Sequence, residues 1–401
     1  MSQLRQLFLR RIAQTSDAPI SLEIARGAGI YLYDPDGKAY LDLIAGISVS
    51  SLGHAHPAVV DAVQQQAASY MHTLVYGELV LSPQVELAEW LTSHLPDTLD
   101  NVYFTNSGTE ATEGAMKLAK RATGRSEIVA CVRAYHGSTQ GAASLMSDDY
   151  FTRPYRPLLP GIKHIDFNCE YCLREQMSII NKRTAAVIIE TVQAEWGVRK
   201  PRPVWLRALR QRCDEVGALL VFDEIQAGIG RTGSLFAFEQ YGVVPDILLL
   251  AKALGAGMPL GAFVARKALM HHLTHSPVLG HISTFGGHPV SCAAALAGLR
   301  AMSESGLIDE VEHKGALFER LLRHSIIKDI RRAGLLMAVE LRDFEQVKAV
   351  IAACLERGLI TDWFLFNDRC LRIAPPLIIT PPEIEKACSI LLEAMDAVCA
   401  S

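Results

Sequence analysis

The sequence has no long apolar run, no long basic run, no internal repeat and no low-complexity linker. Its apolar stretches reach strand length only, which is much too short to cross a bilayer, so we expect no contact with a membrane. Lysine and arginine number 39 against 43 acidic residues, and the formal net charge is -4. This mild acidity argues against a nucleic-acid partner. The chain of 401 residues is 50% hydrophobic, enough for a large core in more than one domain.

Cysteine is scarce and irregularly placed. The 9 cysteines are an odd number and are scattered, so we expect reduced thiols in a cytoplasmic protein. Cys169 and Cys172 form a single CxxC pair without a second pair nearby, and zinc or redox use of it is the less favoured alternative. No carboxylate or cysteine accompanies His54 and His56 in the sequence, so we predict no metal site.

The first residues also lack a targeting pattern. Residues 1–11 are amphipathic and basic, without the continuous apolar segment and the small-residue cleavage site of a secretory signal. We expect a short amphipathic helix there; a mitochondrial presequence, which has a similar composition, is the alternative.

After the N-terminal residues, strand and helix patterns alternate along the chain, which predicts an α/β fold. Residues 22–50 are expected to form a hairpin-like segment around the Asp-Gly turn at 36–37, and a helix is expected to start at Pro57. After residue 100, strands and helices alternate, which is typical of a doubly wound, mostly parallel sheet. The expected strands are 102–105, 128–132, 162–165, 186–190, 219–223, 247–251 and 261–265. The last of them follows after a short loop and is therefore free to run antiparallel.

From residue 289 the pattern changes to a smaller α+β domain. Its expected helices are 289–303, 311–326, 344–357 and 382–400, and its expected strands are 330–335, 337–341 and 370–373. We therefore divide the chain into three parts. These are an N-terminal segment, 1–56, that packs with the small domain, a large cofactor-binding domain, 57–288, and a small C-terminal domain, 289–401.

Two of the expected strands end in charged side chains. The apolar run 246–252 ends in Lys252 before a glycine-rich turn, and the run 218–224 ends in Asp223 and a second carboxylate. The carboxyl ends of parallel strands hold ligands in α/β proteins, so both side chains are expected at one site. A lysine that forms a Schiff base and an aspartate that keeps a pyridine nitrogen protonated suit pyridoxal phosphate. A buried ion pair at the sheet edge is the alternative.

A phosphate site is expected where the strand 102–105 meets the helix that follows it. Ser107, Gly108 and Thr109 lie at that helix start, where free backbone N–H groups, hydroxyls and the helix dipole can bind a phosphate. An ordinary N-cap is the alternative.

Two further patterns lie near expected strand ends. Tyr135 follows a strand and can stack on a flat ring, or pack into the core. Residues 228–233 match GxGxxG, but they do not directly follow a strand at the start of a βαβ unit, so we predict no nicotinamide site.

In this order, the motifs resemble the class III (ornithine-aminotransferase-like) pyridoxal-phosphate aminotransferases of fold type I, over nearly the whole chain. The segments that carry the resemblance are 29–42, 52–57, 106–110, 223–233, 251–261 and 283–289. The resemblance implies an α/β PLP-transferase fold with a smaller α+β domain, and pyridoxal 5′-phosphate as cofactor. It also implies a homodimer with active sites at the interface.

The resemblance assigns roles in cofactor binding. Lys252 would form the Schiff base and shuttle the proton, and Asp223 would pair with the pyridine nitrogen. Gln226 would lie near the ring hydroxyl, Tyr135 would stack on the ring, and Thr284 would reach the phosphate of the other subunit. The other cofactor-binding residues that it implies are Ser107, Gly108, Thr109, His136 and Glu190.

Substrate residues follow from the same resemblance. Glu195 matches a gate glutamate, and Arg372 matches the arginine that it releases when the α-carboxylate of glutamate must be held. Ser138 stands where many relatives that use ornithine derivatives or 4-aminobutyrate have a carboxylate-binding arginine. Thr191 replaces a usual proline, and Trp196 replaces a usual small residue and is expected to narrow the pocket.

We therefore expect an aminotransferase that moves an amino group from a small-molecule donor to a keto acid, with 2-oxoglutarate as the expected acceptor. A pyridoxal-phosphate aminomutase, decarboxylase or epimerase on the same scaffold is the first alternative, and a cofactor-free binding protein is the second. The sequence does not identify the donor or the group that replaces the arginine at Ser138. Arg153 and Arg156 lie downstream, either as replacements or on a solvated surface.

Overall fold

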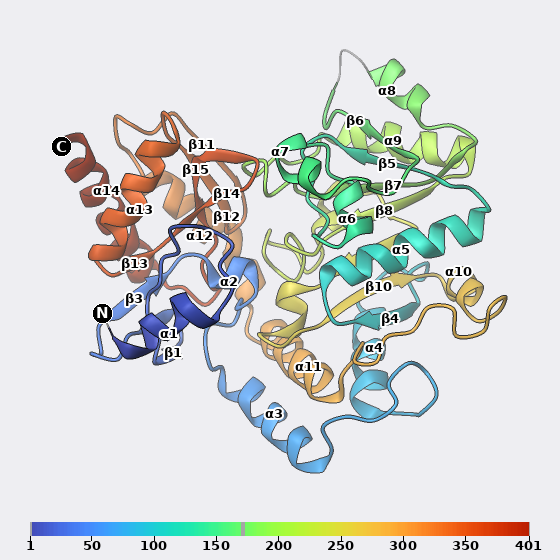
Figure 1. Ribbon diagram of the computed structural model, residues 1–401, viewed down its shortest axis with the longest axis horizontal. Coiled ribbons are helices and arrows are strands. Elements are labelled where there is room, and N and C mark those ends of the chain that lie inside the picture. The colour runs from blue at the N-terminus through green and yellow to red at the C-terminus, as the bar shows by residue number, and fades with distance from the viewer. Residues whose placement is uncertain (1, 170–172, 401) are drawn as a thin grey trace.

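The computed structural model describes residues 2–169 and 173–400, and its largest element is a central sheet (Figure 1). Seven strands form this sheet within the described residues, in the order β4-β10-β9-β8-β7-β5-β6. Their bounds are β4 (Asn101–Thr105), β5 (Glu127–Cys131), β6 (Ile162–Ile165), β7 (Thr184–Glu190), β8 (Leu219–Asp223), β9 (Ile247–Leu250) and β10 (Gly261–Ala265).

Strand directions in the sheet agree with the expected mostly parallel arrangement. β5 to β9 are mutually parallel, whereas β10 runs antiparallel to both β9 and β4. The loop between β9 and β10 is too short for a crossover, so the chain turns back on itself. The carboxyl ends of β7, β8 and β9 consequently lie at one edge, where Glu190 is the register partner of Asp223.

Helices cover both faces of the sheet, which explains the uninterrupted apolar strands. α5 (Gly108–Thr123) packs on one face against β7, β9 and β10, with Val221 and Leu249 in the same core cluster. α9 (Pro203–Val216) packs against β7 and β8, with Leu220 and Leu248 in the core of the other face. Because successive side chains point to opposite faces, every residue of β9 is buried.

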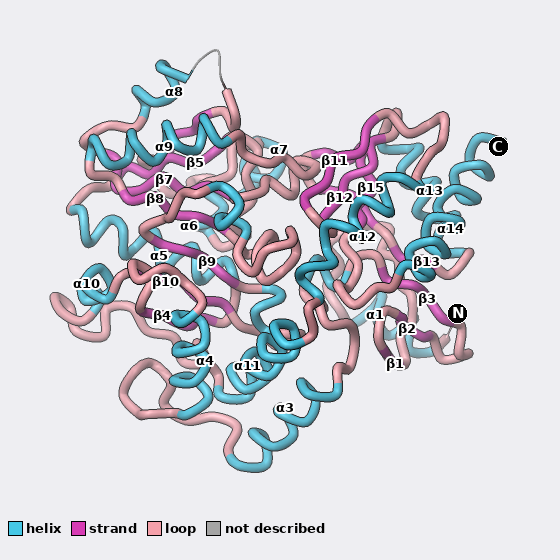
Figure 2. Tube along the Cα trace, turned by 180° about the vertical axis from the view of Figure 1, so that it is seen from behind, coloured by secondary structure: helices cyan, strands magenta, loops and turns pink. Residues whose placement is uncertain are grey.

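The C-terminal region forms a second, fully antiparallel sheet. Its order is β11 (Asp329–Ala333), β12 (Leu336–Glu340), β15 (Asn367–Ile373) and β14 (Asp362–Phe364). The helices α12 (Leu307–Leu321), α13 (Phe344–Glu356) and α14 (Pro381–Ala400) lie beside it (Figure 2). β14 was not expected, since three residues of mixed character give no periodic signal.

The N-terminal segment pairs with this C-terminal region. The hairpin-like segment contains β1 (Arg26–Ala28), β2 (Tyr31–Tyr33) and β3 (Ala39–Asp42), and β13 (Leu359–Ile360) adds a parallel strand to β3. α1 (Gln3–Arg11) is the expected short helix. α11 (Pro289–Glu304) packs against α3 (Pro57–Ser69) and α4 (Ser82–Ser93), on the side of the large sheet. Because α11 begins at residue 289 yet packs on the side of the large sheet, the division of the chain into domains at residues 57 and 289 stays a proposal.

Short elements complete the chain. They are α2 (Ala45–Ser48), α6 (Gln140–Ser144), α7 (Asp149–Thr152), η1 (Arg153–Tyr155), α8 (Leu173–Ile179), η2 (Ala237–Tyr241), η3 (Lys252–Gly255), α10 (Lys267–Met270) and η4 (His271–Leu273). In the part of the chain that is described, no helix is long and apolar enough to cross a membrane.

The cysteines and histidines flagged in the sequence have simple surroundings. Seven cysteines are free thiols, but Cys169 is disulfide-bonded, so the expectation of reduced thiols is wrong at that position. Cys172 of the CxxC pair lies outside the described residues. His54 does have a carboxylate partner, because its Nε2 lies 2.9 Å from Asp42, which is remote in sequence. Residues 2–169 and 173–400 contain no group of three or more ligand side chains that could hold a metal ion.

Candidate active site

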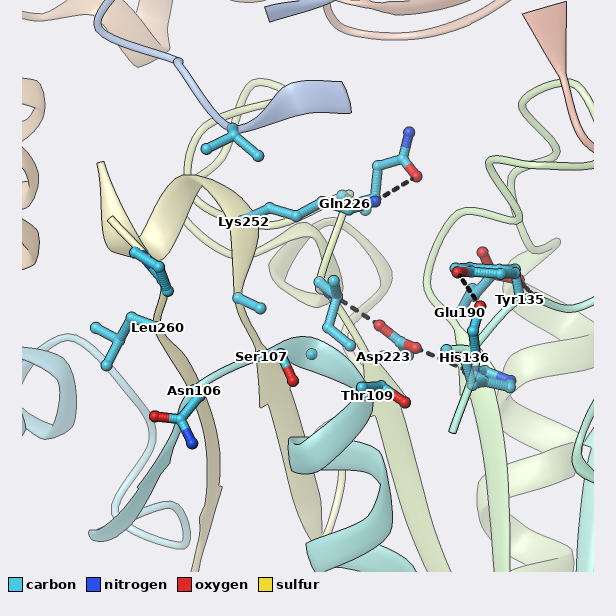
Figure 3. Close-up of a pocket in the computed structure, with 18 of the residues that line it drawn as sticks. Asn106, Ser107, Thr109, Tyr135, His136, Glu190, Asp223, Gln226, Lys252 and Leu260 are labelled. Carbon is cyan, nitrogen blue, oxygen red and sulfur yellow. Dashed lines mark hydrogen bonds and ion pairs between the residues drawn. The ribbon is translucent and has the colours of Figure 1, made fainter. Parts of the chain in front are cut away.

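A cavity of about 500 Å³ opens at the carboxyl edge of β7, β8 and β9 (Figure 3). It is also lined by the start of α5 and by the loop after β5. All the residues predicted to bind the cofactor line this cavity, with the exception of Thr284. Thr284 is exposed in the segment between η4 and α11.

Lys252 projects its amine into this cavity from the turn after β9. Its backbone has a positive φ of 48° at the start of η3, and its Nζ donates a hydrogen bond of 2.9 Å to Oε1 of Gln226. Burial lowers the pKa of Lys252 to about 8, although the nearby Glu195 and Asp223 oppose that shift. A lysine with this pKa holds a substantial fraction of neutral, nucleophilic amine near neutral pH.

Asp223 ends β8 and is held from two sides. Its Oδ2 lies 2.7 Å from Nδ1 of His136, and its Oδ1 accepts the N–H of Ile225 at 2.9 Å. The carboxylate is only 4% exposed and lines the cavity. Both side chains meet at this point although 87 residues separate them. These hydrogen bonds fix the carboxyl group of Asp223 in the wall of the cavity.

Glu190 lies on β7, beside Asp223. Burial, followed by the charge of Asp223, raises the pKa of Glu190 well above its usual value. Its carboxyl accepts the N–H of Tyr135 at 3.2 Å and that of Ala194 at 3.4 Å. We infer that Glu190 favours its neutral form and serves as a hydrogen-bonding group.

The start of α5 forms the opposite wall. Ser107 is the N-cap, and its side chain accepts the N–H of Glu110 at 3.3 Å. A Cβ at Gly108 would approach the side chain of Ile225 to 2.8 Å, so a larger residue would have to displace that side chain between the helix start and the turn after β8. The hydroxyl of Thr109 is bonded to that of Thr139 at 2.7 Å. The exposed N–H groups of a 16-residue helix make this wall suitable for an anion.

Beside the cavity, Glu195 and Arg372 form a buried ion pair. Two parallel contacts of 2.9 and 3.0 Å join their ends. Glu195 also accepts the N–H of Leu365 at 3.0 Å. The resemblance implied this contact, and the two side chains do meet although 177 positions separate them.

The departures from the family pattern occupy different surroundings. Ser138 lines the cavity, and its hydroxyl lies 3.0 Å from the phenol oxygen of Tyr135. Trp196 does not line the cavity, and its ring lies instead near the guanidinium groups of Arg133 and Arg199, at 4.9 and 5.4 Å from the ring centre.

Neither downstream arginine replaces the one expected at Ser138. Arg153 and Arg156 are exposed and do not line the cavity, and Arg156 pairs with Asp149 on the surface. Val49 and Val192 form an apolar part of the wall that was not predicted, because isolated valines carry no signal of a site.

Known proteins resemble the chain over nearly its whole length. Residues 12–395 match the family model described as aminotransferase class-III. An acetylornithine aminotransferase of Methanopyrus kandleri is 41% identical over 92% of this chain and 93% of its own. One from Bacillus cereus is 38% identical over 92% and 94%. Among solved structures, an ornithine aminotransferase from Toxoplasma gondii superposes with a TM-score of 0.89 at 32% identity, over 99% of this chain and 94% of that chain.

Proposed function

The chain belongs to the class III aminotransferases, and on that premise we propose that it transfers the amino group of an amino acid or ω-amine to a keto acid. The proposed donors are of the ornithine, acetylornithine or 4-aminobutyrate type, and the proposed acceptor is 2-oxoglutarate. The observation that carries the proposal is the meeting of Lys252, Asp223 and the start of α5 around one cavity.

Pyridoxal phosphate is the cofactor of this family, and the residues of the cavity fit it. The fit rests on an amine of lowered pKa, a buried carboxyl group and a helix start at which Gly108 leaves little room for a side chain. When bound, the cofactor supplies an aldehyde that accepts the amino group and a ring that withdraws electrons from the substrate carbon.

Each wall has a proposed task in holding the cofactor. Lys252 binds its aldehyde carbon, and Asp223, oriented by His136, holds a proton on the pyridine nitrogen. Ser107, Gly108 and Thr109 bind the phosphate at the start of α5.

The cavity side of the ring is left to the remaining predicted residues. Tyr135 lies against a ring face, Gln226 donates from its Nε2 to the ring hydroxyl, and Glu190 supports the loop that carries Tyr135. Nε2 of Gln226 is buried without a protein partner, which leaves it free for such a hydrogen bond.

Lys252 is also the proposed proton carrier. Its amine takes the proton from the substrate carbon that bears the amino group and returns it to the carbon that accepts nitrogen. A pKa near 8 suits both directions, because general acid–base catalysis works best with a pKa near the operating pH.

Glu195 and Arg372 are the proposed substrate gate. With the pair closed, an ω-amine enters without meeting a free cation. With Glu195 displaced, the guanidinium binds the α-carboxylate of glutamate or 2-oxoglutarate in the same two-pronged manner.

We further propose a cytoplasmic homodimer in which Thr284 of each subunit reaches the phosphate bound by the other. The exposure of Thr284 outside its own cavity supports this assignment. Sedimentation would give the subunit number. A mixture of inactive Lys252→Ala and Thr284→Val chains should regain activity, since one site of each hybrid dimer would be intact.

The test of the reaction is a screen of single donors without acceptor. Holoenzyme would be mixed with glutamate, ornithine, N-acetylornithine, 4-aminobutyrate, lysine, β-alanine or alanine while the visible absorption of the cofactor is followed. Loss of the absorption band, restored by 2-oxoglutarate, is the expected result. Product formation with an unchanged band would instead support an aminomutase, decarboxylase or epimerase.

A further inference from the structure

Arg372 forms ion pairs with two carboxylates rather than one. Besides the two hydrogen bonds to Glu195, its Nε lies 2.9 Å from Oδ1 of Asp362, close enough for an ion pair but not aligned as a hydrogen bond. The side chain of Glu195 is 4% exposed and that of Asp362 is 19% exposed. The proposed gate requires only one of them, so the second needs its own explanation.

The two carboxylates differ in how they are attached. Glu195 lies in the loop after β7 and reaches Arg372 from a different sheet. Asp362 is the register partner of Arg372 on the adjacent strand β14, so the sheet fixes the distance between their backbones. A loop movement can carry Glu195 away from Arg372, whereas the backbone of Asp362 stays beside Arg372 as long as β14 and β15 are paired.

Other groups of β14 hold the guanidinium in the same place. The carbonyl of Trp363 accepts a hydrogen bond of 3.0 Å from Nη2, and the ring of Phe364 lies 4.4 Å below the central carbon. After Glu195 leaves, Nη1 loses its partner and one N–H of Nη2 is freed. These are the two groups that a two-pronged carboxylate contact uses.

We propose that Asp362 is a positioning residue that keeps Arg372 aimed at the place of Glu195, so that a substrate α-carboxylate meets a preformed binding fork. The inference rests on the proposed function, because it concerns the substrates that open the gate. It predicts that Asp362 affects glutamate and 2-oxoglutarate but not an ω-amine that leaves the gate closed.

The charge of Asp362 does not by itself favour one gate state. In the proposed gate, the carboxylate of Glu195 and the carboxylate of a substrate occupy the same place beside Arg372 in turn. The negative charge of Asp362 repels each of them about equally, so the repulsion largely cancels when one replaces the other. What remains is the orientation of the guanidinium, whose loss raises the free energy of substrate binding.

The experiment compares Asp362→Asn and Asp362→Leu with the native holoenzyme. For each, KM and kcat would be measured separately for glutamate, for 2-oxoglutarate and for an ω-amine without an α-carboxylate, N-acetylputrescine. The affinity for glutarate, an unreactive dicarboxylate, would be measured by calorimetry. Asp368→Asn is the matched control, because Asp368 is exposed on β15 of the same sheet.

We expect KM for glutamate and 2-oxoglutarate and the Kd for glutarate to rise on the order of tenfold in Asp362→Leu, with a smaller rise in Asp362→Asn. The half-reaction with N-acetylputrescine should keep its rate in both. Equal losses for all substrates would mean that Asp362 only stabilises the small domain, and unchanged or tighter glutarate binding would overturn the proposal. Failure of native enzyme to exchange amino groups would refute the proposed function instead.

Discussion

Arg372 and Glu195 meet end to end, with Nη1 2.9 Å from Oε1 and Nη2 3.0 Å from Oε2, and the two residues are only 2% and 4% exposed. Burial raises the pKa of Glu195, but the charge and hydrogen bonds of Arg372 outweigh it and the net shift is downward. The pair is therefore ionic at neutral pH. A removable anion on a buried cation is what a site needs when it must serve substrates with and without a carboxylate at the same position.

The first prediction concerns Arg372→Ala. We expect kcat/KM for glutamate to fall by about a hundredfold or more, because a buried two-pronged contact with a carboxylate is lost. The half-reaction of an ω-amine should lose less than about tenfold. Stopped-flow absorption with each donor measures both values. Arg331→Ala is the control, since Arg331 also pairs with carboxylates in the C-terminal sheet. Equal losses for the two donors would contradict the gate.

The second prediction concerns the pH dependence of Lys252. Only its neutral form attacks an aldehyde, and burial lowers its pKa from 10.5 to about 8. The rate at which apoenzyme takes up pyridoxal phosphate should therefore rise with pH up to about 8 and then level off. Lys252→Ala should bind the cofactor without forming the covalent absorption band and should lack turnover. A rate that still climbs through pH 10 would show that the lysine is not shifted.

The sequence predicted the sheet and the core of the site because both depend on local patterns. β7, β8 and β9 are mainly apolar, and Glu190, Asp223 and Lys252 stand at or just after their ends. Since parallel strands bring their carboxyl ends together, Lys252 and Asp223 had to converge once the topology was known.

Contacts that depend on register or on loop direction were not predictable in this way. The hydrogen bond of His136 to Asp223 depends on where the loop after β5 turns. The contact of Asp362 with Arg372 depends on the pairing of a three-residue strand with a bulge next to it. Trp196 follows Glu195 in sequence, yet its ring lies near two arginines and outside the cavity.

The third prediction concerns Ser138. Among the described residues that line the cavity, Lys252 and His136 are the ones with a basic side chain. His136 already forms a hydrogen bond with Asp223. Ser138→Arg should add a partner for a distal carboxylate. We expect the kcat/KM ratio of N-acetylornithine to N-acetylputrescine, which differ by that carboxylate, to rise at least about tenfold. Ser138→Gln adds comparable length without charge and should leave the ratio unchanged. A similar rise with glutamine would show that size, not charge, controls the donor.

The last prediction separates the two neighbouring carboxyls. Glu190 and Asp223 are register partners on adjacent strands, yet burial and the charge of Asp223 raise the pKa of Glu190. A carboxyl that is already protonated resembles an amide in charge and shape, so Glu190→Gln should retain activity within about threefold between pH 6 and 8. Tyr135 and Ala194 donate to different oxygens of Glu190, so the single amide oxygen keeps the shorter bond, from Tyr135, and loses the 3.4 Å bond from Ala194.

Asp223→Asn should behave in the opposite way, although the change in atoms is the same. A neutral amide cannot hold a proton on the pyridine nitrogen, so the ring loses its capacity to withdraw electrons, and we expect kcat to fall by about a thousandfold or more. Steady-state rates and the cofactor absorption spectrum across pH 6–8 measure both variants. If Glu190→Gln proved as damaging as Asp223→Asn, the negative charge would be shared between the two carboxyls, and proton binding at the ring would have to be assigned to the pair.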